Sequence, residues 1–165
     1  MLAINPAEST LVDQMKEFSE IADFDDHKLY LTGYMGARGA PKNMAILSLM
    51  SDPPVLVRGE FNKWVRIEDD KNEDIKSIFD GCHEFIDEHI KVRDVVVHCA
   101  AGVSRSATIV ISYIMKKCGY TYMEAHDYVR ARRSIISPNS GFTMQLIDYE
   151  FDLMLDRTIT SRRTS

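Results

Sequence analysis

The sequence predicts an α/β fold in which helices flank a central, mostly parallel sheet. Strand-like and helix-like runs alternate along the 165 residues, and no internal repeat is present. Val95, Val96 and Val97 form a continuous β-branched run, which is typical of a central strand covered on both faces. This run passes through a short loop directly into an apolar helical segment. That order places a ligand site outside the carboxyl end of the sheet.

The N-terminal part of the chain is predicted to contain one helix and three strands. Apolar residues at helical spacing predict an amphipathic opening helix over residues 6–21. Short β-like runs follow at 28–32, 44–49 and 63–67, separated by Gly, Pro and Asn.

A long amphipathic helix is predicted over residues 73–91, where apolar side chains recur every three or four positions. Asp70 followed by Glu73 offers a capping box at its start. Cys82 falls on the apolar face and is interpreted as a small core residue, with a redox partner for Cys99 as the alternative.

The next predicted helix spans residues 105–118 and ends before Gly119, a residue that commonly terminates helices. Thr121 and Glu124 form a capping box for the helix that follows. The last residues, 157–165, are polar and basic and are predicted to be a flexible tail. The expected layout is therefore an N-terminal helical segment over 1–26, a domain over 27–156 and this tail.

Composition favours a compact soluble domain. Apolar residues make up 45% and charged residues 27%, as in ordinary globular proteins, and the net charge of −5 argues against nucleic-acid binding as the main role. No apolar run approaches the roughly 18 residues that span a bilayer, and the N-terminus lacks the pattern of a signal peptide. Three cysteines without metal-like spacing indicate a reducing compartment, so we expect an intracellular protein, cytoplasmic or nuclear, without metal or cofactor.

The strongest chemical signal is the loop between Cys99 and Arg105. The five residues between them are small or apolar: Ala100, Ala101, Gly102, Val103 and Ser104. Backbone N–H groups of such a loop can converge on one oxyanion, and the start of the following helix adds positive potential. The same field favours a thiolate, and an arginine fork suits phosphate oxygens. The loop therefore predicts a phosphate cradle with a nucleophile at its base.

The segment from His98 to Thr108 resembles the His-Cys-x5-Arg-Ser/Thr signature of protein tyrosine phosphatases, in the wording of the dual-specificity branch. Similar elements of that branch follow at 111–116, at 125–133 and at Pro138-Asn139-Ser140-Gly141-Phe142 with Gln145-Leu146. The resemblance covers about residues 27–150 and is weak between Thr32 and Lys63, the part that shapes the substrate pocket in this family. It implies a small phosphatase of the tyrosine phosphatase-like fold, without a docking domain.

The resemblance also implies roles for single residues. Cys99 would attack phosphorus, Arg105 and the loop N–H groups would hold the phosphoryl oxygens, and Ser106 would bond to the sulfur. His98 would orient the loop and Asn139 would brace it. In the acidic cluster 68–70, the family pattern selects Asp69 as the general acid. Glu68 and Asp70 are expected to be solvated or capping residues.

The implied substrates are phosphoproteins carrying phosphotyrosine, phosphoserine or phosphothreonine, with a protein kinase as a further candidate partner. Lysines that mark phosphoinositide-type members are absent from the loop. Arg130, Arg132 and Arg133 are expected to form a solvated helix face, with recognition of a second phosphate as the alternative. Two other functions stay open: a phosphoprotein-binding module without turnover, and a phosphatase for a non-protein phosphate.

Overall fold

The computed structural model describes residues 10–164. Within that range five strands form one sheet in the order β1-β2-β5-β3-β4. The strands are β1 (Ser19–Phe24), β2 (His27–Gly33), β3 (Ala45–Met50), β4 (Phe61–Arg66) and β5 (Val95–Cys99). Only the β1–β2 pair of this sheet is antiparallel. The predicted α/β fold with a mostly parallel sheet is confirmed.

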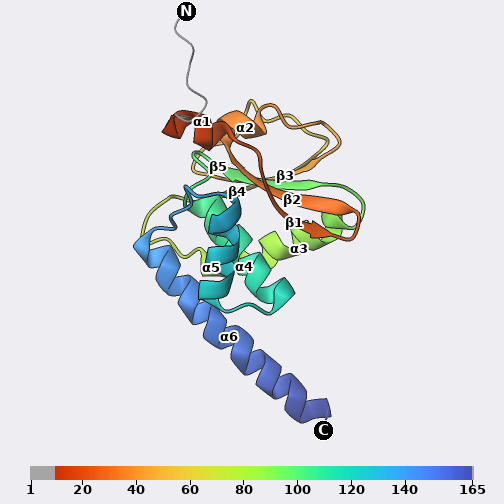
Figure 1. Cartoon of the computed structure of the whole chain (residues 1–165), viewed down its shortest axis with the longest axis vertical. Helices are drawn as coiled ribbons and strands as arrows, with labels where there is room; N and C mark the ends of the chain where they lie inside the picture. Colours follow the sequence, from red (N-terminus) through yellow and green to blue (C-terminus); the bar gives the residue numbers. More distant parts are fainter. Residues whose placement is uncertain (1–9, 165) are drawn as a thin grey trace, which may run out of the picture.

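Helices cover both faces of this sheet (Figure 1). One face carries α1 (Leu11–Lys16) and α2 (Tyr34–Ala37). The other carries the short 3₁₀ turn η1 (Lys76–Ile78), α3 (Phe79–Ile90), α4 (Arg105–Cys118), α5 (Tyr122–Arg132) and the first half of α6 (Ser140–Thr164). Among residues 10–164, no helix is both long and apolar enough to cross a membrane.

The central strand β5 separates two hydrophobic cores. Val95 and Val97 belong to the large core beneath α3 and α4, whereas Val96 belongs to a smaller core near α2. Successive residues of a strand point to opposite faces, and a core covers each face of β5, so all three side chains are fully buried. The unbroken apolar run therefore reflects a strand covered on both sides, as predicted.

The N-terminal segment differs from the prediction. The opening helix is only six residues long, and Ser19–Phe24 forms a strand that pairs with β2 instead of continuing the helix. Ile21 fits a helical and an extended pattern equally well, and long-range pairing of the backbone decides for the strand. Asp25, with a φ of 59°, makes the tight turn of this hairpin. Positions 6–9 of the predicted helix lie outside the described residues.

The start of the long helix also differs. Regular α-helix begins at Phe79, and the Asp70–Glu73 pair does not cap it. Asp70 instead accepts a bond from Asn72 N within a turn, and the Asp74 side chain accepts from Ser77 N beside η1. The later caps are as predicted: Gly119 is left-handed, with φ 71°, and Thr121 and Glu124 form a reciprocal capping box.

The basic C-terminal segment is helical rather than a flexible tail. Helix α6 runs without a break to Thr164, so it crosses the predicted domain limit at residue 156. No Gly or Pro occurs after Gly141 to stop it, and the Thr158 hydroxyl donates to Met154 O within the helix. Ser165 lies outside the described residues.

Two titratable side chains of α3, Cys82 and His83, are core residues. Cys82 is 1% exposed, and burial raises its pKa to about 12, so the thiol stays protonated. This environment supports the core interpretation of Cys82 rather than a redox role. Next to it, His83 stacks on Phe79 and bonds to the Ser112 hydroxyl through Nε2 at 2.8 Å. Burial lowers the pKa of His83 to about 4.

Candidate active site

The loop after β5 forms the predicted cradle. Each of its carbonyls from Cys99 to Ser104 accepts a hydrogen bond from a donor outside the loop. Cys99 O accepts from His98 Nδ1, Ala100 O from Tyr34 N, and Ala101 O from Arg133 Nη2. Gly102 O accepts from Arg133 Nε, Val103 O from Ser137 N, and Ser104 O from Thr108 N. Because N–H and C=O point in opposite directions across a trans peptide, the N–H groups turn toward the inside of the loop. Together with the start of α4 they form an anion site.

Gly102 lets this loop close tightly. Its φ of 67° lies in the left-handed region. A Cβ at this position would lie 2.6 Å from Thr32 O and 2.6 Å from Arg133 Nη2. Both the backbone conformation and the available space therefore require glycine here.

Cys99 ends β5 at the base of the loop and is 2% exposed. Its Sγ lies 3.0 Å from Ser106 Oγ and accepts a hydrogen bond from Gly102 N at 3.3 Å. The Gly102 N–H and the start of α4 both direct positive potential toward the sulfur. The structure thus brings together Cys99 and Ser106 as the sequence predicts.

Arg105 is 8% exposed at the first turn of α4. Its Nη1 donates to Ile67 O at 3.1 Å and to Ser51 Oγ at 3.3 Å, and Ser51 donates to Glu68 Oε2 at 2.6 Å. Its buried Nε has no hydrogen-bond partner among residues 10–164. A buried guanidinium N–H without a partner is costly, so an anion bound beside it would be stabilised.

His98 holds the back of the nucleophile's strand. Its Nδ1 donates to Cys99 O at 3.2 Å, and its Nε2 accepts from the Ser48 hydroxyl at 2.6 Å. This pattern is that of a neutral imidazole, which fits the burial that lowers the pKa of His98 to about 4. His98 therefore lies in a position to orient the loop rather than to transfer protons at neutral pH.

The two buried histidines make stability depend on pH. In the folded chain the pKa values of His83 and His98 are about 4, against an ordinary 6.5 in the unfolded chain. Between these values the unfolded state binds more protons, so the stabilisation is complete above pH 6.5 and is lost as pH falls to 4. We expect each histidine to lower the unfolding free energy by about 2 kcal/mol between pH 7 and pH 5. Urea unfolding at the two pH values measures the loss. Imidazole NMR signals of His83 and His98 that titrate near pH 6.5 would contradict it.

Asp69 is joined to the cradle through Asn139. The Asn139 side chain donates to Asp69 Oδ1 at 3.0 Å, and its backbone N–H donates to Ser104 Oγ at 3.0 Å. The same side chain accepts from Phe142 N and so begins α6. One asparagine therefore fixes the acidic loop, the phosphate cradle and a helix start relative to one another.

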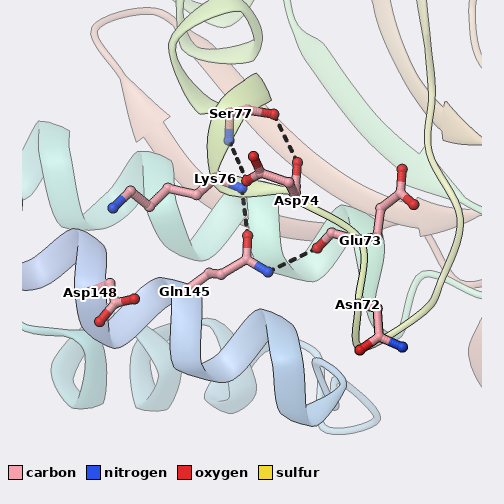
Figure 2. A pocket seen from close by; sticks show the side chains of 7 residues that line it. All are labelled: Asn72, Glu73, Asp74, Lys76, Ser77, Gln145 and Asp148. Atoms are coloured by element: carbon pink, nitrogen blue, oxygen red, sulfur yellow. Dashed lines mark hydrogen bonds between the residues drawn. The ribbon is translucent and has the colours of Figure 1, made fainter.

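The segment after Asp69 is also tied to α6. Gln145 Nε2 donates to Glu73 O at 2.8 Å, and its Oε1 accepts from Lys76 N at 2.9 Å (Figure 2). At Gly141, a Cβ would collide with the Lys71 carbonyl, so this close approach needs glycine. The polar hollow beside this joint is lined by Asn72, Glu73, Asp74, Lys76, Ser77, Gln145 and Asp148, with no residue of the cradle.

Replacing Gln145 by alanine should destabilise the domain. The change removes two hydrogen bonds to backbone groups, which predicts a loss of about 1–3 kcal/mol of unfolding free energy. Gln145→Glu keeps the acceptor for Lys76 N but places a carboxylate oxygen against Glu73 O, so it should also be destabilising. Urea unfolding followed by circular dichroism measures both, and a wild-type midpoint for Gln145→Ala would refute the role.

Arg133 is the main residue whose role sequence reasoning missed. It is 3% exposed, not part of a solvated helix face, and burial lowers its pKa. Besides two loop carbonyls, its guanidinium binds the carbonyls of Met15 and Glu17 and the hydroxyl of Ser19. It therefore connects the outside of the cradle to the N-terminal segment. No local pattern signals this, since the partners are distant in sequence.

Arg133→Met should cost about 2–5 kcal/mol of unfolding free energy, because it leaves several buried carbonyls without a donor. Arg130→Met, at an exposed position of α5, the helix that ends just before Arg133, should stay within about 0.5 kcal/mol of wild type. Chemical unfolding of the pair provides the comparison, and equal stabilities would show that Arg133 is not structural.

The structure places the predicted site residues as follows. The nucleophile candidate, its serine neighbour, the arginine and the loop lie in one continuous cradle, and Asp69 reaches it through Asn139. Glu68 is exposed as expected, yet it contacts Arg105 through Ser51. Between residues 10 and 164, no group of three or more His, Cys, Asp or Glu side chains is arranged to hold a metal ion.

Comparison with protein families agrees with this geometry. Residues 45–152 match the family model "Dual specificity phosphatase, catalytic domain". A probable dual specificity protein phosphatase of Dictyostelium discoideum is 35% identical over 159 residues, covering 90% of this chain and 74% of that protein. Human dual specificity protein phosphatase 5 is 45% identical over 93 residues, 56% of this chain. The chain spans 24% of the length of that human protein.

Solved structures show the same fold. A human tyrosine phosphatase-like serine/threonine/tyrosine-interacting protein is 30% identical with a TM-score of 0.68, over 76% of this chain and 93% of that one. DUSP15 is 28% identical with a TM-score of 0.71, over 81% of this chain and 91% of that one. The resemblance therefore extends from the cradle to most of the domain.

Proposed function

Because the chain belongs to the dual specificity phosphatase family, we propose that it hydrolyses phosphate monoesters on proteins through a cysteinyl-phosphate at Cys99. The observation that carries the proposal is the Ser104–Asn139–Asp69 connection. It holds an acid on the same rigid frame as the nucleophile's loop.

In the first step, the Cys99 thiolate attacks phosphorus and the bond to the leaving oxygen breaks. Asp69, in its protonated form, gives its proton to that oxygen. Arg105 and the inward N–H groups of the loop bind the three remaining phosphoryl oxygens. Charge is redistributed over these oxygens in the transition state, so fixed donors there stabilise it more than the ground state.

In the second step, water attacks the phosphorus of the cysteinyl-phosphate. Asp69, now a carboxylate, takes a proton from this water, and the sulfur leaves as thiolate. Ser106 Oγ, 3.0 Å from Sγ, donates a hydrogen bond to the departing sulfur. The acid is thereby returned to its protonated form, inorganic phosphate is released, and the cycle needs no metal.

Phosphoproteins are the substrate class that the cradle favours. Its floor carries Ala100, Ala101 and Val103, without the additional cations that a multiply phosphorylated headgroup would require. A phosphorylated protein kinase is one candidate substrate within this class. A catalytic thiol must remain reduced, which supports a location inside the cell.

Hydrolysis of p-nitrophenyl phosphate with and without a chelator tests the chemistry, and matched phosphotyrosine, phosphoserine and phosphothreonine peptides test the substrate class. We expect turnover that is insensitive to the chelator and that includes the peptides. Strict dependence on added metal would overturn the mechanism. Turnover of phosphoinositides without the peptides would assign a non-protein substrate.

A binding module without turnover is the second candidate, since one structural relative is called phosphatase-like and interacting. Tight phosphopeptide binding with no hydrolysis would favour it. The presence of Cys99, Arg105 and Asp69 in one frame favours the enzyme.

A further inference from the structure

Helix α6 carries apolar side chains on two opposite faces. One face packs on the domain through Phe142, Leu146 and Tyr149, which are buried. The other face is exposed: Met144 60%, Phe151 62%, Met154 53%, Leu155 61% and Ile159 43%. With 3.6 residues per turn, Phe151 points away from the side on which Leu146 and Tyr149 pack. The domain therefore cannot cover this second face.

The spacing of the second face is that of a helix-pairing seam. Met144, Ile147, Phe151, Met154 and Thr158 follow one another at intervals of three, four, three and four residues. Alternation of three and four is the heptad pattern by which one helix packs along another. Leu155 flanks the seam and widens it.

The second half of α6 packs little on the domain. Residues 154–164 are all exposed, and Figure 1 shows this half of the helix projecting beyond the body of the molecule. A helix of such length is marginal alone in water, because its stability normally comes from packing of an apolar face. A packing partner along the seam would supply that stabilisation.

The charges on α6 define the direction of the partner. Beside the seam, the acidic residues Asp148 and Glu150 precede the basic residues Arg157 and Arg162. Two copies side by side in opposite directions place the acidic part of each near the basic end of the other. Parallel copies would place like charges together. The two acids beside the seam, Asp148 and Glu150, also oppose docking on an anionic membrane.

We propose that α6 pairs with α6 of a second copy of this chain, antiparallel and about a two-fold axis. Phe151 of each copy lies beside Met154 of the other, and Met144 lies beside Ser161. Such an interface is self-complementary, as two-fold symmetry requires. The projecting half of each helix packs along the domain-supported half of its partner, so both exposed segments are covered.

Light scattering coupled to size exclusion tests the assembly on the full chain. We expect twice the 18.9 kDa chain mass for wild type and a single-chain mass for the Phe151→Glu, Met154→Glu double variant. Val92→Glu, at a residue 60% exposed outside the helix, is the matched control and should remain dimeric. Phosphatase turnover of the double variant should match wild type, and its circular dichroism should change by no more than the fraying of the projecting half of α6, which separates loss of pairing from loss of fold or function. A monomeric wild type, or a dimer that survives the double variant, would overturn the proposal.

Cysteine cross-linking tests the direction, in a Cys118→Ser background that removes the exposed native thiol. A mixture of Met144→Cys and Ser161→Cys proteins should form a disulfide-linked dimer under mild oxidation, whereas neither protein should do so alone. In the antiparallel pair, residue 144 and its own counterpart are separated by about 26 Å along the axis, beyond disulfide reach. Cross-linking of each protein with itself, and not in the mixture, would show a parallel pair and refute the arrangement.

Discussion

Cys99→Ser should lower kcat on p-nitrophenyl phosphate by about 10⁴–10⁶-fold, the scale seen when a covalent nucleophile is removed. The serine hydroxyl fits the position beside Ser106 and Gly102, but it stays protonated at neutral pH and attacks phosphorus far more slowly than a thiolate. Initial-rate kinetics measure the effect. Phosphopeptide binding should persist, because the cradle and Arg105 are unchanged.

Cys118→Ser is the matched control for this loss. Its thiol is exposed at the end of α4, distant in the chain from the loop, and the change should leave turnover at the wild-type level. Activity that survives Cys99→Ser would rule out Cys99 as the nucleophile.

Asp69→Asn should lower kcat by about 10²–10⁴-fold, the usual contribution of a general acid. The asparagine preserves the size of the side chain and a carbonyl oxygen for Asn139, so the loop should stay in place. It cannot donate an acidic proton to the leaving oxygen. The loss should therefore be larger for phosphoserine, whose alkoxide is a poor leaving group, than for p-nitrophenyl phosphate.

The neighbouring carboxylates provide controls for Asp69. Asp70→Asn retains the acceptor for Asn72 N and should remain close to wild type, and Glu68→Gln tests the contact with Ser51 separately. Equal losses in Asp69→Asn and Asp70→Asn, or a loss at Asp69 that is independent of the leaving group, would contradict the assignment of Asp69.

Features set by local chemistry could be predicted from the sequence. The valine run, the small-residue loop and the Thr121–Glu124 cap each depend on residues within a few positions of one another. The cradle could be predicted for the same reason, because strand, loop and helix are consecutive.

Features set by distant contacts could not be predicted in this way. Ser19–Phe24 becomes a strand only because β2 pairs with it, and Arg133 is buried because it meets carbonyls more than 100 residues away as well as the loop. The contact between Asn139 and Asp69 spans 70 residues, so the family pattern, rather than local periodicity, indicated Asp69. The full length of α6 follows from the absence of a helix breaker after Gly141. The polar and basic composition of the last residues instead favoured the prediction of a flexible tail.

Direct detection of the cysteinyl-phosphate tests the central claim. Wild-type protein mixed with excess p-nitrophenyl phosphate, quenched within a single turnover and analysed by intact-mass and peptide spectrometry, should carry one phosphoryl group on the peptide that contains Cys99. The burst of p-nitrophenol should equal the amount of this adduct, and Cys99→Ser should show neither. Rapid turnover with no adduct and no burst, or an adduct on another residue, would contradict the two-step mechanism.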